Sequence, residues 1–529
     1  DIGSGITYSS NFNNDSIEWR PGSLGTDFTW QQSVPAGTRI NSGPDNANEI
    51  VWVTNPVGNH IEGEKSFLEG PCFNFLGSKR PMISLDYFSD LNATSGAVIQ
   101  YSFDKGVSWT NLGTIESGIE WFNERSIAGN PGDQFLDQLG WSQLNSGWRE
   151  AKHNLDGLRN RTNVRLRIAL GTFGNTTREG FAVTNFEIRE KDKMTLIEHF
   201  TNSSDINAKQ GDIDHNDVVL ENRFDVLDVQ YHTDFPNDDP INLDNSLENN
   251  ARSLFYGVSS VPRTVFEGNQ FNNATSSWIA QSNKVNFQGQ VRHKEIAYRS
   301  LEDAKFSIEL DVQKTTSSIS GNMDITALPG VEAGKEYTAF IAVIEKNIPW
   351  NTPSTGVVLQ DVEFKNVFKK FLPQASGTNI TTLNNAGDIK SINFNWNYEN
   401  VYFPDSVFIV AFIQDNVSRE IYQAATDDTT NVFVPNGTQD EIVSQSELDF
   451  EVYPNPSLGR SIVDFSQVSD GNEVLRIYDQ MGNIIVRENI NLGTKNLLIN
   501  LQDQAAGLYI LQFVHPKYGT RTKRLVLTK

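Results

Sequence analysis

The side chains that most often do catalysis are few and scattered in this sequence. The seven histidines lie far apart, at His60, His153, His199, His215, His232, His293 and His515. No G-x-S-x-G, H-E-x-x-H, P-loop or G-x-G-x-x-G motif marks a nucleophile, a metal site or a phosphate site. His199 and His232 each end a predicted strand and are the only two expected to approach each other, and a structural role is the simpler interpretation.

Acidic residues leave one enzymatic alternative open. The 66 Asp and Glu residues could supply the carboxylate pair of a glycosidase, but nothing in the sequence marks such a pair. We therefore predict that the chain is not an enzyme. The alternative is a secreted hydrolase, or an accessory module of one, acting on polysaccharide or protein.

Cysteine count and net charge exclude further classes. Cys72 is the only cysteine, so the sequence excludes an intrachain disulfide, a CxxC redox centre and zinc sites built from several cysteines. The 529 residues carry a formal net charge of -23. Because phosphate binding needs a basic surface, nucleic acid is not predicted as a partner.

Calcium is the only cofactor that the residue types suggest. Asp45, Asn46 and Glu49 lie close together and offer hard oxygen ligands, although acidic loop residues are more often simply solvated. The segment DIDHN at 212–216 opens like an EF-hand loop, but aspartate and arginine occupy the later positions that need glycine and glutamate. We expect an exposed acidic loop there.

The pattern of apolar residues predicts the elements that would position these groups. Apolar and polar residues alternate over short runs separated by Gly, Asn and Asp, which is typical of strands joined by turns. We predict a mainly β, multidomain chain with no membrane-spanning helix. The expected parts are a β-sandwich over 1–190, an α/β domain over 193–292, a second β-sandwich over 293–425, a polar linker over 426–448 and a small β-domain over 449–529.

The sequence begins at Asp1 without a signal peptide, so we expect a processed chain or a piece of a longer precursor, in which a protease or glycosidase could precede Asp1.

The first part contains predicted strands at 81–88, 97–103, 107–112, 164–170 and 180–188. The words SLDYFSD, VIQYSFDKGVSWTNLG, VRLRIAL and GFAVTNFEI, in this order and spacing, resemble the MAM-like jelly-roll modules of secreted bacterial proteins over most of 75–190. In that family, two acids after the Gly-Phe motif can help to bind calcium. Thr184 and Asn185 stand at those positions here, which leaves Asn185 as a weak candidate beside the acidic residues near position 45.

Four tryptophans in this first part could form a sugar-stacking face, and a glycan or another surface ligand is therefore a possible partner. They are Trp109, Trp121, Trp141 and Trp148. Tryptophans bury a large apolar area, so a position in the core or at its rim is the more common outcome.

The second part reads as a strand at 194–200, a polar loop, a strand at 224–231, a helix at 248–256 and the segment GVSSVPRTVFEG. This order resembles the thioredoxin-fold domains of bacterial outer-membrane lipoproteins, whose first strand leads into CxxC. The resemblance places Asp205 and Ala208 at the two cysteine positions and Pro262 at the cis-proline. Neither residue can form a thiolate, so redox activity is excluded, and we expect a scaffold kept for packing or binding.

The third part contains long strand-like runs, among them YTAFIAVIE and SVFIVAFIQ. Strands of this length with turn signals predict an immunoglobulin-like sandwich. The two runs also resemble the domain that follows the thioredoxin unit in the same lipoprotein family.

The last part carries four landmarks within about 80 residues: YPNP near its start, VLRIYDQMGN, GLYIL and a closing KRLVL. In this order they resemble the type A C-terminal sorting domain of the type IX secretion system of Bacteroidetes. The resemblance marks Tyr453, Pro454, Asn455, Pro456, Gly482, Gly507, Tyr509, Lys523, Arg524, Leu525 and Val526 as the sorting signal. We expect a seven-strand sandwich, rigid prolines at its entry, a hairpin turn at Gly482 and special backbone geometry at Gly507.

This resemblance implies a secreted, cell-surface cargo protein exported across the outer membrane, with a passenger that binds or adheres. Gliding bacteria use such cargo as motility adhesins, and the sequence does not separate that use from nutrient capture. The resemblance implies three partners: the translocon, an outer-membrane shuttle barrel and a sortase-like peptidase. Residues 517–529 hold five basic and no acidic residues, opposite in sign to the whole chain, so we expect this end to dock on an acidic or strand-accepting receptor.

Overall fold

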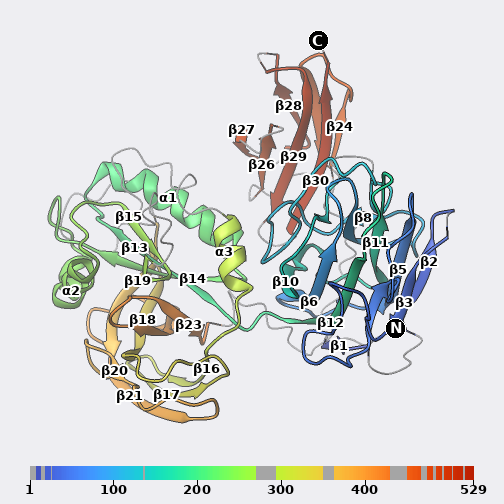
Figure 1. Cartoon of the computed structure of the whole chain (residues 1–529). Helices are drawn as coiled ribbons and strands as arrows, with labels where there is room; N and C mark the ends of the chain where they lie inside the picture. The colour runs from blue at the N-terminus through green and yellow to red at the C-terminus, as the bar shows by residue number, and fades with distance from the viewer. Residues whose placement is uncertain are drawn as a thin grey trace. The chain divides into compact units, whose positions relative to one another are not determined.

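The computed structural model describes residues 7–12, 18–25, 27–134, 138–269, 293–349, 363–428, 450–465, 473–479, 484–490, 494–502, 504–515 and 519–528. They are mainly strands that form several sheets (Figure 1), which confirms the predicted fold class. The chain divides into two compact units, 1–435 and 436–529, and the division falls inside the segment predicted as a linker. None of the described helices combines the length and the apolar character that a membrane span requires.

Two antiparallel sheets of six strands each build the jelly roll. One has the order β10-β6-β12-β4-β3, with β1 beside β12, and the other β2-β5-β11-β7-β8, with β9 beside β7. Alternating residues of both sheets bury one aromatic-rich core. The strands are β1 (Tyr8–Ser10), β2 (Arg20–Ser23), β3 (Trp30–Ser33), β4 (Val51–Thr54), β5 (Lys65–Phe73), β6 (Pro81–Asp90), β7 (Gly96–Ser102), β8 (Thr110–Asn111), β9 (Trp141–Ser142), β10 (Arg149–Asn154), β11 (Val164–Gly171) and β12 (Gly180–Glu190).

The connection after the jelly roll is fixed by buried charges. Asp225 accepts hydrogen bonds from Arg80 Nε at 3.0 Å and from Lys191 Nζ at 2.6 Å. Burial favours the neutral acid, yet these two cations hold the pKa of Asp225 below its ordinary value. Arg80 also donates to the Lys191 carbonyl oxygen at 3.1 Å. These bonds fix the position of the segment that follows β12.

An eight-stranded sheet then crosses the boundary predicted near 292. Its order is β15-β13-β14-β19-β18-β22-β23, with β20 beside β18. The parallel pairing of β14 with β19, where Gln230 lies opposite Val367, joins the predicted α/β domain to the predicted second sandwich. The strands are β13 (Thr195–Thr201), β14 (Val226–His232), β15 (Arg263–Phe266), β18 (Tyr337–Pro349), β19 (Glu363–Leu372), β20 (Thr378–Asn379), β22 (Val407–Asp415) and β23 (Ile421–Thr426). The boundary at 292 therefore does not separate two independent sheets.

Helices cover the β13–β15 part of this sheet on both faces (Figure 1). Helix α1 (Ile206–Glu221) and helix α3 (His293–Ser300) pack on one face through Val218 and Ile296. Helix α2 (Ser246–Tyr256) packs on the other face through Tyr256. Asn245 caps the start of α2, and Gly257, with a φ of 67°, ends it in the left-handed conformation that glycine adopts without strain.

Strand β18 is buried on both faces, which explains its unbroken apolar run. Phe340, Ala342 and Ile344 face the α2 side, whereas Ala339 and Ile341 face a second sheet. That sheet has the order β16-β17-β21 and consists of β16 (Phe306–Lys314), β17 (Ser318–Ala327) and β21 (Ile389–Asn397). The sandwich expected over 293–425 is thus present, but one of its sheets continues into the preceding part.

A buried ion pair ties α2 to three strands. Arg252 donates to both carboxylate oxygens of Glu198, at 2.7 and 2.8 Å, and to Gln414 Oε1 at 3.0 Å. Tyr256 and Tyr231 donate their hydroxyls to Glu198 at 2.6 and 2.9 Å. We call these five residues the Glu198 network. Glu198 is 0% exposed and Arg252 is 4% exposed, so the network is sealed from solvent and its charges are satisfied within it.

The second unit, in its described residues, contains seven strands in two sheets, as expected. Strands β24 (Phe450–Tyr453), β25 (Arg460–Phe465) and β28 (Asn496–Asn500) form one sheet, and the other has the order β27-β26-β29-β30. The latter strands are β26 (Val474–Tyr478), β27 (Ile484–Asn489), β29 (Gly507–His515) and β30 (Gly519–Leu527). Phe450, Phe465 and Phe513 meet in the core between the sheets.

Candidate functional site

The YPNP landmark lies directly against the last strand of the chain. The side chain of Asn455 accepts a hydrogen bond from the Val526 N–H at 2.9 Å and donates one to the Arg524 carbonyl oxygen at 2.6 Å. An amide offers both a donor and an acceptor, so this one side chain pairs with the outer edge of β30 as a neighbouring strand would. The first and the last sorting landmarks are thus one structural unit.

Backbone hydrogen bonds of Ser457 continue the pairing between the YPNP segment and β30. The Ser457 N–H donates to the Val526 carbonyl oxygen, and the Thr528 N–H donates to the Ser457 carbonyl oxygen, both at 2.8 Å. Ser457 and Leu527 form an isolated parallel bridge. The Ser457 hydroxyl accepts from the Gly459 N–H at 3.1 Å and so fixes the turn that leads to β25. Ser457 was missed in the sequence because it lies just outside the landmark.

The surface around this junction is apolar and basic. Tyr453, Leu458 and Val526 are 47%, 80% and 38% exposed, and Arg524 is also exposed. We call these four residues together with Asn455 the sorting surface. Large exposed apolar groups that gather at one place mark interaction sites more often than single ones do.

The remaining signal residues have different positions. Tyr509 and Leu525 are buried, and the Tyr509 hydroxyl donates to the Ala505 carbonyl oxygen at 2.6 Å. Gly507 opens β29 with a φ of 158°, a positive value that glycine adopts more readily than other residues. Lys523 lies on β30, and both YPNP prolines, Pro454 and Pro456, follow cis peptide bonds. Gly482, Lys517 and Lys529 lie outside the described residues.

The positions matched to redox residues lie where α1 begins. Asp205 precedes the helix and Ala208 is fully buried in its first turn. The Val261–Pro262 bond is cis, as expected. A Cβ added to Gly211, one turn after Ala208, would lie 2.3 Å from the Pro262 ring, so α1 and the cis-proline are in direct contact. The thioredoxin likeness itself stays a prediction.

The expectation of an exposed acidic loop at 212–216 is wrong, because this segment lies in α1 and turns inward. Asp212 accepts from Thr201 Oγ1 at 2.8 Å and lies 2.8 Å from His199 Nε2. His215 stacks on His199 with ring centroids 4.1 Å apart and bonds Asp228 at 2.6 Å. Asp212 and Asp228 can be buried because each is paired with an imidazole.

His199 and His232 do not form a joint site. His199 pairs with Asp212, whereas His232 Nδ1 lies 2.8 Å from Asp239 Oδ2. Thr264 Oγ1, His199 and Asp212 follow each other at 2.7 and 2.8 Å, the order of a catalytic triad. However, Thr264 is 0% and His199 1% exposed. Both side chains are therefore shielded from solvent, and their bonds join β15, β13 and α1.

His153 is another buried imidazole, at the end of β10. It lies 2.8 Å from the Ser117 hydroxyl and 2.6 Å from the Asn154 carbonyl oxygen, and it packs against Trp121 with ring centroids 4.7 Å apart. Burial lowers the pKa of His153 from 6.5 to about 4. The folded jelly roll therefore holds this residue neutral.

We expect His153 to make the jelly roll sensitive to acid. Between pH 6.5 and 4 the imidazole of His153 is protonated in the unfolded chain but stays neutral in the folded chain. The free energy of unfolding therefore falls as the pH falls. This single group accounts for a loss of about 2 kcal/mol between pH 7 and pH 5. Urea unfolding at both pH values should show a smaller loss in His153→Gln than in the parent. An equal loss in both proteins would contradict the assignment.

The four calcium candidates stay a prediction. Asn185 Nδ2 donates to Asp86 at 2.8 Å and reaches Asp45 at 3.4 Å. Glu49 accepts from the Asp45 N–H at 3.0 Å, and Asn46 accepts from the Asn48 N–H at 3.0 Å. Among the described residues, no group of three or more His, Cys, Asp or Glu side chains is placed to hold a metal ion.

The four tryptophans do not form one face. Trp121 and Trp141 are buried in the jelly-roll core. Trp148 is half-buried and donates to the Ser42 carbonyl oxygen at 2.9 Å. Trp109 is half-buried on the outside of the β2-β5-β11-β7-β8 sheet, where the Arg167 guanidinium lies 4.2 Å from its ring centroid.

Comparison with known proteins bears directly on the second unit. The family described as "Secretion system C-terminal sorting domain" matches residues 451–528. A search of curated proteins gave no match. Among solved structures, the chain is similar to HBP35 of Porphyromonas gingivalis at 12% identity and a TM-score of 0.35, over 64% of this chain and 99% of that one.

Two further solved structures from the same organism are similar to shorter parts. The K1 cleaved adhesin domain of Lys-gingipain matches at 12% identity and a TM-score of 0.22, over 35% of this chain and 99% of that one. A domain of the outer membrane lipoprotein Omp28 matches at 16% identity and a TM-score of 0.17, over 23% and 86%. The family match at the C-terminal end confirms the predicted sorting domain and secretion to the cell surface. The chain therefore ends in a C-terminal sorting domain of the type IX secretion system, of which it is a secreted cargo.

Proposed function

We propose that the passenger, residues 1–428, is a binding protein that acts at the cell surface without catalysis, and that the sorting domain is its export address. The observation that carries the proposal is the location of the histidines. All five whose side chains are described, His60, His153, His199, His215 and His232, are 6% exposed or less. None of them can act as a general base toward an outside substrate. Adhesion, of the kind that gliding cells use, is the specific form of binding that we propose.

We propose further that the sorting surface is where the export machinery binds. An outer-membrane shuttle barrel and the translocon would contact Tyr453, Leu458 and Val526, and a sortase-like peptidase would later remove the domain. The apolar exposure of these residues supports a protein partner. The neighbouring basic Arg524 would favour an acidic contact on that partner.

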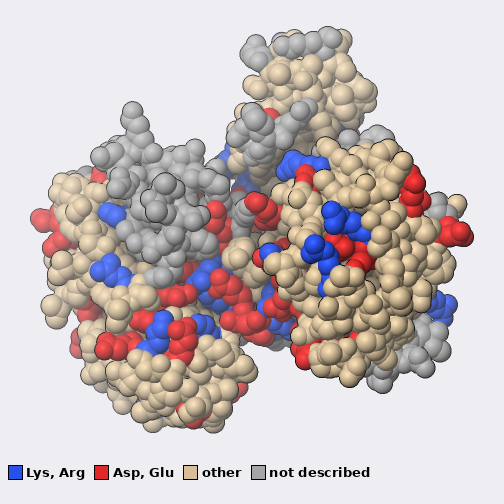
Figure 2. Space-filling view, in the orientation of Figure 1, with Lys and Arg blue, Asp and Glu red and all other residues tan. Residues whose placement is uncertain are grey.

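The distribution of charged side chains on the surface also supports a partner other than nucleic acid. Figure 2 shows acidic and basic side chains intermingled on the visible face, without one continuous basic field. Together with the net charge of -23, this arrangement disfavours polyanionic ligands.

Two measurements test this function. Removal of residues 449–529 should leave the passenger inside the cell envelope, whereas the full chain should reach the surface, as read by protease accessibility of intact cells. The purified full chain should give no turnover on a panel of polysaccharide and protein substrates. Surface delivery without residues 449–529 would contradict the export address, and turnover would favour a hydrolase.

A further inference from the structure

The outer face of one jelly-roll sheet carries a row of polar side chains across all five strands of its path. Arg20 lies opposite Glu69, Glu69 opposite Arg167, Arg167 opposite Gln100, and Gln100 opposite Asn111. Because side chains on directly opposed positions point to the same face, these five form a continuous line from β2 to β8. We call this line the polar row.

The middle of the polar row is buried although it is polar. Gln100 is 1% and Arg167 is 4% exposed. Arg167 donates to Gln100 Oε1 from Nε at 2.9 Å and from Nη2 at 2.7 Å. Its guanidinium lies over the rings of Trp109 and Phe67, 4.2 and 5.3 Å from their centroids. Burial of such groups opposes folding unless they are bonded, so plain packing would be served better by apolar residues.

The two carboxylates that act electrostatically on Arg167 are each paired with another cation. Glu69 pairs with Arg165, and Asp133 pairs with Lys65 at 2.9 Å. Within the described part of the chain, Nε and Nη2 of Arg167 donate to uncharged acceptors. These are the side-chain oxygen of Gln100 and the carbonyl oxygen of Gly132. The row is therefore held rigidly by neutral acceptors and aromatic rings rather than by ion pairs of its own.

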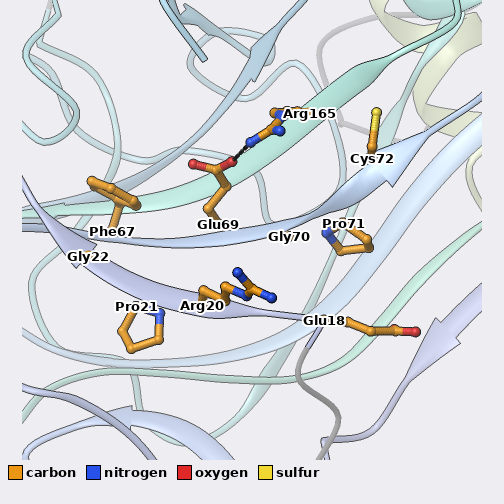
Figure 3. A pocket seen from close by; sticks show the side chains of 10 residues that line it. All are labelled: Glu18, Arg20, Pro21, Gly22, Phe67, Glu69, Gly70, Pro71, Cys72 and Arg165. Carbon is orange, nitrogen blue, oxygen red and sulfur yellow. Dashed lines mark hydrogen bonds and ion pairs between the residues drawn. The ribbon is translucent and has the colours of Figure 1, made fainter. Parts of the chain in front are cut away.

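The polar row opens into a hollow at its β2 end. The hollow has a volume of about 450 Å³, and Arg20, Phe67, Glu69 and Arg165 line it. These side chains come from the neighbouring strands β2, β5 and β11. Figure 3 shows Glu69 pointing toward Arg165, with which it forms an ion pair. A Cβ on Gly22 would lie 2.6 Å from the Phe67 ring, so glycine is what allows this strand to lie close to the ring. Cys72 also lines the hollow.

The charges in the hollow balance. Glu18 and Glu69 stand against Arg20 and Arg165, so no excess of either sign attracts a charged ligand. The two carboxylates accept hydrogen bonds and the two guanidinium groups donate them. A ligand hydroxyl, which can donate and accept at the same time, can therefore bond to both kinds of group. Phe67 adds an apolar surface, the part of its ring that Arg167 and Gly22 leave uncovered. The volume lies within the range of small-molecule sites.

From these observations we infer that the hollow at the end of the polar row binds sugar units of a neutral polysaccharide, with a sugar ring against Phe67 and its hydroxyls on Arg20, Glu69 and Arg165. This inference rests on the proposed function, since it names the ligand class of the binding passenger. An acidic polysaccharide is disfavoured because the chain is itself strongly acidic.

Affinity electrophoresis of the full chain tests the inference. The gels contain a neutral polysaccharide (mixed-linkage β-glucan, galactomannan or xyloglucan) or an acidic one (alginate or polygalacturonate). We expect retardation in at least one neutral gel and none in the acidic gels. Arg20→Ala and Phe67→Ala should each weaken this binding at least about ten-fold, the effect of about 1.4 kcal/mol. Phe173→Ala, which removes a ring 56% exposed elsewhere on the same domain, is the matched control.

Cys72 provides a second test that needs no folding-sensitive substitution. It is the only cysteine, so a bulky maleimide reacts at one place and should block the hollow. Retardation in no neutral gel, retardation only in acidic gels, or binding unchanged by both the maleimide and Arg20→Ala would overturn the inference. If the chain still attaches to cell or surface material in those cases, the binding function stands. Turnover of a polysaccharide would instead refute the proposed function.

Discussion

Asn455→Ala should sharply reduce the amount of chain that reaches the cell surface. The substitution removes both side-chain bonds that join the YPNP turn to β30, those to the Val526 N–H and to the Arg524 carbonyl oxygen. Two such bonds contribute about 1–3 kcal/mol together, which corresponds to a loss of roughly 5-fold to 150-fold in the population of the docked terminal strand. A receptor that reads the sorting surface as one unit then loses its target.

Surface display of the full chain, measured by protease accessibility, would be compared with hydrogen exchange of residues 519–528. Asn496→Ala, at an exposed position of β28 in the same unit, is the matched control and should be exported normally. Asn455→Asp keeps the acceptor for Val526 but loses the donor to Arg524, so we expect an intermediate result. Normal display of Asn455→Ala together with faster exchange in β30 would show that docking of this strand is not what the receptor recognises.

Arg252→Met should be the most destabilising substitution in the Glu198 network. It leaves the Glu198 carboxylate buried without a cation, and breaking a buried pair in this way costs about 3–5 kcal/mol. It also removes the bond to Gln414 that joins α2 to β22. Urea unfolding of the full chain, followed by hydrogen exchange of β13 and β22, measures the loss.

Two further variants separate charge from packing. Combining Glu198→Gln with Arg252→Met removes both charges, so the double variant should regain about 2 kcal/mol relative to Arg252→Met alone. Lys365→Met breaks an ion pair on β19 whose partners are 36% and 45% exposed, and it should cost less than about 1 kcal/mol. If the double variant is no more stable than Arg252→Met, the unpaired carboxylate is not the cause of the loss.

Much of the strand content could be predicted from the sequence because apolar runs mark it directly. The run over 337–345 became β18, and burial on both faces explains why it does not alternate. Helix α1 was not predicted. It contains Gly211, and its inner face carries Asp212 and His215, so its sequence lacks the apolar period that reveals a helix. The pairing of β14 with β19 leaves no local signal in the sequence, so a sheet shared across the boundary near 292 could not be predicted.

The sorting landmarks could be read because four words occur in a fixed order. Their contact could not, because Asn455 and Val526 are 71 residues apart and only the folded sandwich brings them together. The polar row was hidden for a related reason. Arg167 looks like an ordinary outward residue of VRLRIAL, and its alignment with Glu69 and Gln100 depends on the register of three strands.

The eight-stranded sheet also determines when the passenger can fold. Its pairings and the Glu198 network connect residues far apart in the chain, such as Arg252 and Gln414, which are 162 residues apart. Contacts of this kind form slowly, because long loops must close before any stabilisation is gained. The sheet is complete only when its last strand, β23 (Ile421–Thr426), is in place. The strands near residue 230 therefore complete their sheet only after the strands near residue 367 have joined them.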